Sequence, residues 1–530
     1  MPHFLTDVLA AWEKYRDRPL FKQLVQGAEG QKTWIPITYE DFQNETDRVG
    51  RHWRATLSSQ GFKSSDVIGL WATGQKYTDL IHIYSLIRAG FIPQLFSVTY
   101  QSGEVVRDLL IACNGKALLY DPAFAVAVEG HVDLPAICLP AVDTLQSSSD
   151  PLPPLLDVAE DEPAMILHTS GTTSGKPKPV PVTHRNLKGQ QSQFRGINQG
   201  AFETQDIYNK LGSYCHIGTA SSISYMSLRG DCTVQTSRSD FDAEEFLQLT
   251  REAGVNRLFL YAPWLSNLLK FARTNQDVLD TLKNMRQIIY TGASLNPEDE
   301  AWMVAQNIPG TLLYATTEAF LILISDLNER QDLPAMRLIP GVECEFIPND
   351  NSEPDKGTLY DVFLPAHSSN CPHPSFRNRE NGHYTGDLFE QVKPGRYIFR
   401  GRNDDWIRTG PSLSFCDTKA IEDNVLQVSS QLVSNCTAVG HYKPGVVLFV
   451  EPVTPVTPGS DKEMVLKKEI IALTAPFNAR LFLHERITDP GRIVVVPQGK
   501  LARTKEKGNI RRKAVEDEFS DILQEIYRIV

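Results

Sequence analysis

Short apolar runs and amphipathic stretches alternate along most of the chain. The runs have the length of buried strands, and the stretches between them repeat hydrophobic positions with the period of a helix. Thr38, with Asp41 three residues on, is a capping pattern for the start of one helix, and Gly90 ends another. Strands that alternate with helices favour a parallel sheet covered by helices, so the predicted fold class is α/β. The predicted strands are residues 66–71, 91–96, 117–120, 255–260 and 286–290, and the predicted helices are residues 1–17, from 38 on, 72–88, 104–112 and 516–529.

A stretch rich in glycine and hydroxyl side chains directly follows an apolar run that ends at His168. Backbone N–H groups of such a loop can point at one anion, and the glycines let the chain come close to it. The loop suits the phosphates of a nucleotide, with a helix beginning near Thr183. A flexible linker is the alternative. A Walker-type loop is excluded because Gly171 and Gly175 are one residue too close for that motif, and because Pro177 follows the lysine. The predicted phosphate-binding residues are Thr169, Ser170, Gly171, Thr172, Thr173, Ser174, Gly175 and Lys176.

The letters TSGTTSGKPK in this stretch resemble the phosphate-loop signature of the adenylate-forming superfamily. That superfamily contains acyl-CoA and aryl-CoA ligases, luciferases and the adenylation domains of nonribosomal peptide synthetases. The resemblance implies companion motifs downstream. One is similar to Y-G-x-T-E and implies that Thr317 contacts phosphate and that Glu318 holds Mg²⁺, a hard cation suited to a carboxylate beside a triphosphate. This motif consists of Tyr314, Ala315, Thr316, Thr317 and Glu318, with alanine in place of the usual glycine.

Two further motifs concern the ribose and a hinge. Tyr384-Thr385-Gly386-Asp387 resembles Y-x-T-G-D, in which one carboxylate can accept hydrogen bonds from both ribose hydroxyls. The stretch 401–407 resembles G-R-x-D-D-x-I and implies that Arg402 reaches the ribose and that Asp404 is a hinge. The resemblance therefore implies a large N-terminal adenylation core of helix-covered sheets, residues 1–403, and a small mobile α+β C-terminal domain, residues 404–530.

The family's catalytic lysine has two candidates near the C-terminus. Lys500 fits the spacing G-K-[IL]-x-R, and Lys507 fits the variant R-T-x-K-G-x-[IV]-x-R that is typical of fungal multidomain members. The basic run that contains both lysines is also typical of a solvated surface. Spacing favours Lys500.

The acid pocket is predicted around His216, which resembles the histidine of acid ligases, although a lone histidine is more often part of a core. Amino-acid-activating relatives have a carboxylate here for the substrate ammonium, whereas Asp231 lies well downstream. A buried ammonium without a partner is costly, so the pattern predicts an aryl or other non-amino acid. Gly292 and Ala293, at the carboxyl end of a strand, are predicted to contact both nucleotide and acid. The predicted pocket residues are His216, Gly218, Thr219, Tyr290, Gly292, Ala293, Tyr314 and Phe320.

Composition narrows the class of protein. The 530 residues are 41% hydrophobic and 22% charged, which is typical of a soluble protein with more than one domain. A formal charge of −11 argues against nucleic-acid binding, and no apolar stretch reaches the length of a membrane span. Acidic residues in the first helix argue against a targeting peptide, and eight dispersed cysteines suit a reducing cytoplasm.

The motifs together predict an enzyme that uses ATP and Mg²⁺ to convert a carboxylic acid to acyl-AMP and pyrophosphate. Catalysis would consist of positioning and charge stabilisation. The chain resembles most closely the adenylation domain of fungal carboxylic acid reductases that are similar to nonribosomal peptide synthetases. That resemblance implies transfer of the acyl group to the phosphopantetheine of a carrier domain, with a reductase domain as further partner. The alternatives are a stand-alone acyl- or aryl-CoA ligase, with CoA as acceptor, and a nucleotide-binding regulatory protein without chemistry.

Overall fold

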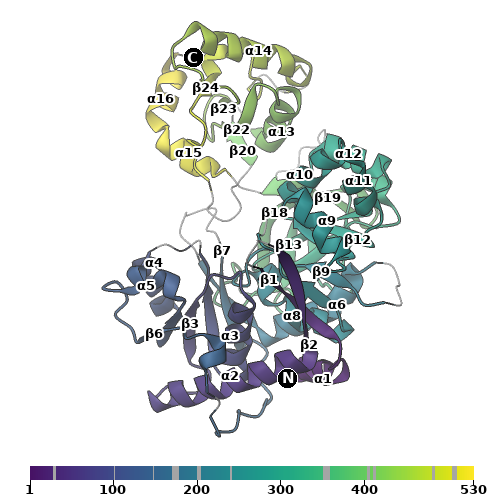
Figure 1. The fold of residues 1–530 in the computed structure, drawn as a ribbon. Helices are drawn as coiled ribbons and strands as arrows, with labels where there is room; N and C mark the ends of the chain where they lie inside the picture. Colours follow the sequence, from purple (N-terminus) through teal and green to yellow (C-terminus); the bar gives the residue numbers. More distant parts are fainter. Residues whose placement is uncertain are drawn as a thin grey trace. The chain divides into compact units, whose positions relative to one another are not determined.

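The chain forms two compact units, each of which is described by itself (Figure 1). The larger unit contains most of the chain up to Tyr384, and the smaller unit contains Phe346–Val362 and most residues from Thr385 on. Strands β18 (Gly382–Lys393) and β19 (Arg396–Arg402) are grouped largely with the smaller unit, although they precede the predicted hinge. Asp404 lies outside the described residues, so the hinge and the boundary at residue 404 stay predictions. The structure, a computed structural model, describes residues 1–27, 31–98, 100, 102–146, 148–169, 178–199, 204–238, 241–349, 358–402, 406–409, 414–479, 481, 484–503 and 510–529.

A six-stranded sheet in the larger unit confirms the predicted alternation of strands and helices. Its order is β6-β5-β3-β4-β7-β8, with parallel pairing up to β7 and an antiparallel edge strand β8. Gly69 of β3 allows helix α4 (Gly103–Ala112) to pack closely, because a Cβ on Gly69 would lie 2.7 Å from Leu110. The strands are β3 (Val67–Trp71), β4 (Ile92–Phe96), β5 (Ala117–Tyr120), β6 (Ala136–Cys138), β7 (Pro163–Thr169) and β8 (Lys178–Thr183).

The larger unit also contains a nine-stranded sheet, in the order β15-β14-β13-β12-β11-β9-β10-β1-β2. Its central strands β13 to β1 are parallel, and antiparallel strands close both edges. The carboxyl ends of β11, β12 and β13 therefore meet at one edge of the sheet. The strands are β1 (Pro19–Gln26), β2 (Lys32–Thr38), β9 (Ile207–Asn209), β10 (Cys232–Val234), β11 (Arg257–Tyr261), β12 (Gln287–Thr291), β13 (Gly310–Thr316), β14 (Phe320–Ile324) and β15 (Arg337–Leu338).

Helices cover these sheets (Figure 1). Aromatic side chains fill the space between α1, α2 and α3. The Trp12 ring contacts Phe42 at 5.1 Å between centroids, and Phe42 contacts Tyr84 at 6.0 Å. The predicted cap of α2 is confirmed, since Thr38 and Asp41 exchange hydrogen bonds with each other's backbone. The helices of this unit are α1 (Leu5–Lys14), α2 (Tyr39–Ser59), α3 (Tyr77–Arg88), α4 (Gly103–Ala112), α5 (Ala125–Val128), α6 (His184–Ile197), α7 (Ile217–Ala220), α8 (Ser222–Met226), α9 (Ala243–Arg251), α10 (Ala262–Ala272), α11 (Gln276–Lys283) and α12 (Pro297–Ala305).

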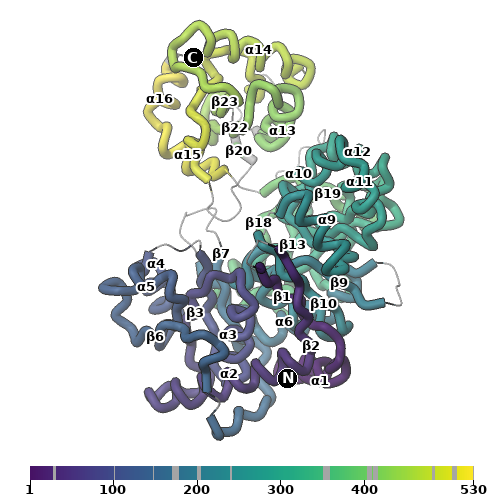
Figure 2. Tube along the Cα trace, viewed as in Figure 1, coloured from purple at the N-terminus to yellow at the C-terminus, as the bar shows by residue number. Residues whose placement is uncertain are grey.

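Among the described residues from Glu345 on, the chain forms three small sheets and four α-helices. Figure 2 shows the yellow helices α15 and α16 beside the green strands β22 and β23. The single helix predicted over residues 516–529 is wrong, because the chain turns at Phe519, whose ring packs on Phe449 at 5.0 Å. The elements are β16 (Glu345–Pro348), β17 (Leu359–Pro365), β18 (Gly382–Lys393), β19 (Arg396–Arg402), β20 (Trp406–Thr409), β21 (Ser414–Asp417), β22 (Val433–Val439), β23 (Val447–Pro452), β24 (Ile493–Val495), α13 (Thr418–Val428), α14 (Asp461–Asn478), α15 (Arg512–Glu518) and α16 (Ser520–Ile529).

None of the helices in the described part of the chain combines the length and the apolar character that a membrane crossing requires.

Candidate active site

The predicted phosphate loop follows β7 and precedes β8, which pair as an antiparallel hairpin. Thr169 is the pairing partner of Lys178, so the two ends of the loop lie side by side. The sequence pattern missed β8, whose Pro179 and Pro181 are tolerated because β8 is an edge strand. Residues 170–177 lie outside the described residues, so the phosphate contacts of Ser170 to Lys176 stay predictions.

Residues of both strands of this hairpin are firmly held by hydrogen bonds. His168 is buried in β7, its Nδ1 lies 3.0 Å from the Leu95 carbonyl oxygen, and its ring stacks on Phe96. Burial lowers the pKa of His168 to about 4, so the ring is neutral. At the other end, Thr183 caps α6 and exchanges hydrogen bonds with Asn186, which confirms the predicted helix start.

The second predicted motif forms a tight turn between β13 and β14. Thr316 pairs with Phe320, so Thr317, Glu318 and Ala319 make the turn itself. The Ala319 amide donates to the Thr316 hydroxyl at 3.0 Å. Thr317 is buried and Glu318 is half-buried at the carboxyl end of β13. The structure thus brings the residues from Tyr314 to Glu318 to one edge of the sheet.

Glu318 is the predicted Mg²⁺ ligand, and its surroundings are compatible with that role. Among the residues that the structure describes, no three or more histidine, cysteine or acidic side chains are grouped to hold a metal. A single half-buried carboxylate fits Mg²⁺, which keeps several waters and is held largely by substrate phosphates rather than by a protein cage. Glu318 would hold the ion from the turn described above.

Tyr261, at the end of β11, connects several predicted pocket residues. A Cβ on Gly292 would lie 2.9 Å from the Tyr261 ring, and one on Gly212 would lie 3.6 Å from it. The Tyr261 hydroxyl lies 3.4 Å from Nδ1 of His216. Gly292 and Gly212 both have positive φ angles, of 85° and 70°. The tyrosine ring therefore lies against two glycine backbones with its hydroxyl toward His216.

Tyr261 was not among the predicted site residues. Its only sequence signal is its position after an apolar strand and directly before Ala262-Pro263, where α10 begins. His216 caps α7, and its Nδ1 accepts a hydrogen bond from the Gly218 amide at 3.4 Å. A neutral imidazole that accepts at Nδ1 carries its proton on Nε2. His216 can therefore donate a hydrogen bond through Nε2.

The other predicted pocket residues have different surroundings. Thr219 is buried, and its hydroxyl donates to the Leu211 carbonyl oxygen. Ala293 is exposed beyond the end of β12. Phe320 belongs to a hydrophobic core cluster of the larger unit, with a φ angle of 61°. Tyr290 is fully buried and its hydroxyl donates to Glu300 of α12 at 3.5 Å. Their contacts with an acid stay predictions.

Asp387 and Arg402, the residues predicted to hold the ribose, are pairing partners in β18 and β19. Arg402 Nη1 donates to Asp387 Oδ1 at 3.1 Å. Gly386 has a φ angle of 77°, and a Cβ there would lie 3.1 Å from the Arg402 guanidinium. The two side chains thus lie together on the smaller unit, and their contact with ribose stays a prediction.

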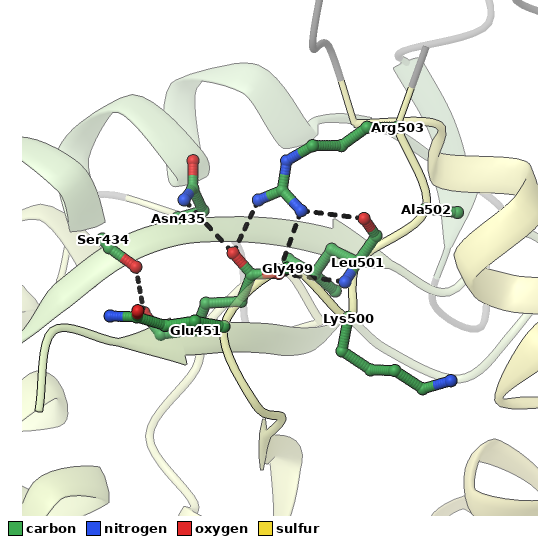
Figure 3. A pocket seen from close by; sticks show the side chains of 9 residues that line it. Ser434, Asn435, Glu451, Gly499, Lys500, Leu501, Ala502 and Arg503 are labelled. Carbon is green, nitrogen blue, oxygen red and sulfur yellow. Dashed lines mark hydrogen bonds and ion pairs between the residues drawn. The ribbon is translucent and has the colours of Figure 1, made fainter. Parts of the chain in front are cut away.

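Lys500 lies in a turn at a surface concavity of the smaller unit (Figure 3). The turn is held by Glu451, which accepts from the Leu501 amide at 2.9 Å and forms two bonds with Arg503, at 3.0 and 2.6 Å. Burial opposes ionisation of Glu451, but these bonds outweigh it and lower its pKa. Figure 3 shows the Lys500 side chain pointing away from this pair. Its ammonium contacts Glu518 at 2.6 Å.

Lys507, the other candidate, lies outside the described residues. The chain on either side of it is joined by an antiparallel bridge between Arg503 and Ile510, and the Arg511 amide donates to the Ala502 carbonyl oxygen. The choice between the two lysines is therefore a matter for experiment.

Comparisons with known proteins agree with the fold. The model of the AMP-binding enzyme family matches residues 9–358, and that of the AMP-binding enzyme C-terminal domain matches residues 416–530. The AMP-binding domain-containing enzyme iboA of Amanita muscaria (strain Koide BX008) is 32% identical over 92% of this chain and 95% of its own length. The adenylate-forming reductase stbB of Stachybotrys bisbyi is 23% identical over 84% of this chain, which spans only 41% of that protein.

A solved structure confirms the predicted fold class. O-succinylbenzoate coenzyme A synthetase (MenE) from Bacillus subtilis, in complex with AMP, superimposes over 98% of each chain with a TM-score of 0.76. The two sequences are 18% identical, so the similarity concerns the fold alone.

Proposed function

Because the chain belongs to the family of AMP-binding enzymes, we propose that it activates an aryl or other non-amino carboxylic acid as an acyl-adenylate and passes the acyl group to a thiol. In the first step a carboxylate oxygen attacks the α-phosphorus of ATP, and pyrophosphate leaves. In the second step the thiol sulfur attacks the acyl carbon, and AMP leaves with the former carboxylate oxygen. The thiol proton is released to solvent or to a base.

The position of Tyr261 supports an aryl acid. Its half-buried ring lies against the backbones of Gly212 and Gly292 and makes a T-shaped contact with the Trp264 ring, at 4.8 Å between centroids. A flat ring of a substrate packs well on such an aromatic surface. His216 lies at the hydroxyl end of Tyr261 and can donate through Nε2 to a ring hydroxyl or a carboxylate of the acid.

The surroundings of Asp231 support a non-amino acid. Asp231 is the acidic residue nearest to His216 downstream in the sequence, and it is buried with a 3.2 Å contact to Arg229. Burial raises the pKa of Asp231 to about 7, with Arg229 opposing the shift. A carboxylate that is already paired with a guanidinium is a poor partner for a substrate ammonium.

Residues that follow β7 and β13 would position the phosphates. Thr317 and the loop from Ser170 to Lys176 would donate hydrogen bonds to phosphate oxygens, and Glu318 would hold Mg²⁺. When bound, Mg²⁺ supplies positive charge that stabilises the charge on the phosphate oxygens. In the smaller unit Asp387 and Arg402 would hold the ribose, and Lys500 would stabilise the charge that develops at the α-phosphate. Rotation of the C-terminal domain about Asp404 would switch the enzyme from acyl-AMP formation to transfer of the acyl group to the thiol.

The acceptor has two candidate sources. The similarity to stbB supports the phosphopantetheine of a carrier domain, with a reductase domain as further partner, as proposed from the sequence motifs. Free CoA is the second candidate, as the sequence motifs also allow. We propose the carrier-bound thiol first and CoA as the alternative.

The proposal is tested by pyrophosphate release with benzoic, hydroxybenzoic, phenylacetic, aliphatic and α-amino acids, each with wild type and Tyr261→Ala. We expect wild type to release most pyrophosphate with an aryl acid, and Tyr261→Ala to lose this preference for aryl over aliphatic acids. Tyr208→Phe is the control. Tyr208 lies in the same sheet as Tyr261, and the substitution removes a buried hydroxyl that binds Asn198. An α-amino acid that exceeds every aryl and aliphatic acid would contradict the proposal.

Further outcomes distinguish the two acceptor thiols and test whether the protein is instead a nucleotide-binding regulatory protein. Thioester formation with free CoA at the rate seen with a phosphopantetheinylated carrier would favour the alternative ligase. Release of no pyrophosphate with any acid, together with ATP binding, would indicate a regulatory nucleotide-binding protein instead.

A further inference from the structure

A buried amide network links α6 to the turn that carries Glu318. Its members are three amide side chains of the larger unit, Asn186 and Gln193 on α6 and Asn370 on the segment between β17 and β18. All three are at most 1% exposed. We call this set the Asn370 network. Buried amides are retained in proteins where their hydrogen bonds are made, so the partners of each are informative.

Asn370 binds the turn on both sides of Phe320. Its Nδ2 donates to the Ala319 carbonyl oxygen at 2.7 Å and to the Leu321 carbonyl oxygen at 2.9 Å. Phe320 has a φ angle of 61°, a left-handed conformation that is unfavourable for a residue with a Cβ. The two hydrogen bonds of Asn370 thus hold a strained residue in place, two positions after Glu318.

Asn370 is itself held from α6. Gln193 Nε2 donates to Asn370 Oδ1 at 2.6 Å, which orients the Asn370 amide so that its Nδ2 faces the turn. Asn186 Nδ2 donates to the carbonyl oxygens of Ser369 and Cys371, at 2.8 and 3.0 Å. Asn186 therefore holds the backbone on both sides of Asn370.

The same network reaches the hairpin that carries the predicted phosphate loop. Asn186 Oδ1 accepts from the amide and the hydroxyl of Thr183, the last residue of β8, at 2.9 and 2.8 Å. Gly189 of α6 lets the segment around Ser369 approach this helix closely, because a Cβ on Gly189 would lie 2.5 Å from the Ser369 side chain. A continuous set of buried hydrogen bonds thus joins the end of β8 to the Glu318 turn.

We propose that Asn370 is a positioning residue that fixes Glu318 relative to the phosphate-binding hairpin and so sets the affinity for the magnesium–nucleotide complex. The inference rests on the proposed cation role of Glu318. Residues that orient a metal ligand affect metal affinity although they do not touch the ion. A network that served stability alone would affect nucleotide binding equally with and without Mg²⁺.

The experiment measures the dissociation constant of α,β-methylene-ATP by calorimetry with and without Mg²⁺. The readout is the ratio of the two constants, which isolates the contribution of the cation and requires no knowledge of the acid. We expect Asn370→Ala to reduce the ratio roughly tenfold. The double variant Asn370→Ala/Glu318→Gln should show the same ratio as Glu318→Gln alone, because Asn370 acts through Glu318.

Asn256→Ala is the matched control. Asn256 also makes two backbone hydrogen bonds, to Ile207 and Gln205, but it precedes β11, at the opposite end of the strand from Tyr261. We expect this variant to lower the melting temperature and to keep the wild-type ratio. If Asn370→Ala does not fold, Gln193→Ala should show a smaller fall in the ratio, since it removes the partner that orients Asn370.

The outcomes separate the inference from the proposed function. A lowered ratio in Glu318→Gln with a wild-type ratio in Asn370→Ala, or in Gln193→Ala where only that variant folds, would overturn the inference alone. A wild-type ratio in Glu318→Gln would refute the cation role of Glu318 and the inference with it. Equal losses in Asn370→Ala and the Asn256→Ala control would show that the network is only structural.

Discussion

Lys500→Ala is expected to abolish most acyl-AMP formation while leaving the fold nearly as stable as wild type. The Lys500 side chain is 51% exposed and its partner Glu518 is 37% exposed. Ion pairs with this exposure contribute about 0–1 kcal/mol to stability. The turn itself depends on the Leu501 amide and Arg503, which bind Glu451 and are unaffected by the substitution. The variant should therefore melt within a few degrees of wild type.

The expected catalytic loss is much larger. Loss of one preorganised group that stabilises developing charge costs roughly 10²–10³ in rate, or about 3–4 kcal/mol. The assay is acid-dependent exchange of labelled pyrophosphate into ATP, which reports the first half-reaction. Transfer to a thiol from preformed acyl-AMP is measured separately and should be largely retained. The difference between the two half-reactions distinguishes a role at the α-phosphate from general damage.

Two control variants and a variant of the rival lysine make this result specific to Lys500. Glu518→Ala removes the same ion pair but keeps the ammonium, so its exchange rate should match wild type. Lys513→Ala removes another exposed lysine of the basic run, paired with Asp517 at 2.7 Å, and should also match wild type. Exchange by Lys500→Ala within about threefold of Lys513→Ala, less than 1 kcal/mol of barrier, would refute the reasoning. A large loss in Lys507→Ala alone would assign the role to that lysine.

Three further substitutions test the site and the core. Glu318→Gln should lower pyrophosphate release by roughly 10²-fold, and wild-type activity at saturating Mg²⁺ would refute its cation role. Asp206→Asn should cost about 3 kcal/mol of unfolding free energy in urea, because Asp206 contacts the fully buried Arg257 at 3.0 Å. Burial opposes ionisation of Asp206, but Arg257 and neighbouring arginines lower its pKa. Wild type should therefore lose this stability as the pH falls below about 4, whereas Asp206→Asn should not. Burial raises the pKa of Glu300 to about 7 despite its bond from Tyr290, so ionised Glu300 destabilises the fold as the pH rises through that value. Glu300→Gln should gain stability relative to wild type between about pH 5 and pH 8, and an unchanged difference in unfolding free energy would contradict this.

Features that depend on neighbours in the sequence could be predicted. The cap of α2 requires only Thr38 and Asp41, and the start of α6 requires only Thr183 and the residues that follow it. The parallel sheets follow from apolar runs that alternate with helical patterns, each readable within a short window. The Thr317–Glu318 turn also lies within one contiguous motif.

Features that depend on distant residues could not be predicted. Tyr261 and His216 are 45 residues apart, and their contact requires the order of strands in the nine-stranded sheet. Asn370 lies 177 residues from Gln193, and nothing in its sequence surroundings marks it as a partner of the Glu318 turn. Strand β8 was missed because its prolines disfavour strands in general, and only its position at the sheet edge permits them. Phe519 interrupts the last helix because it packs on Phe449, a contact that periodicity does not show.

The central claim, formation of an acyl-adenylate, is tested most directly by oxygen transfer from acid to AMP. The acid of the panel that releases most pyrophosphate is labelled with ¹⁸O in both carboxylate oxygens and incubated with ATP and Mg²⁺. Hydroxylamine is added as acceptor, so that no thiol needs to be known. Attack of a carboxylate oxygen on the α-phosphorus leaves that oxygen on phosphorus when the acyl group departs. We expect mass spectrometry to find one ¹⁸O atom in each AMP produced, together with the acyl hydroxamate. AMP without ¹⁸O, or ADP and phosphate as the products, would contradict the account.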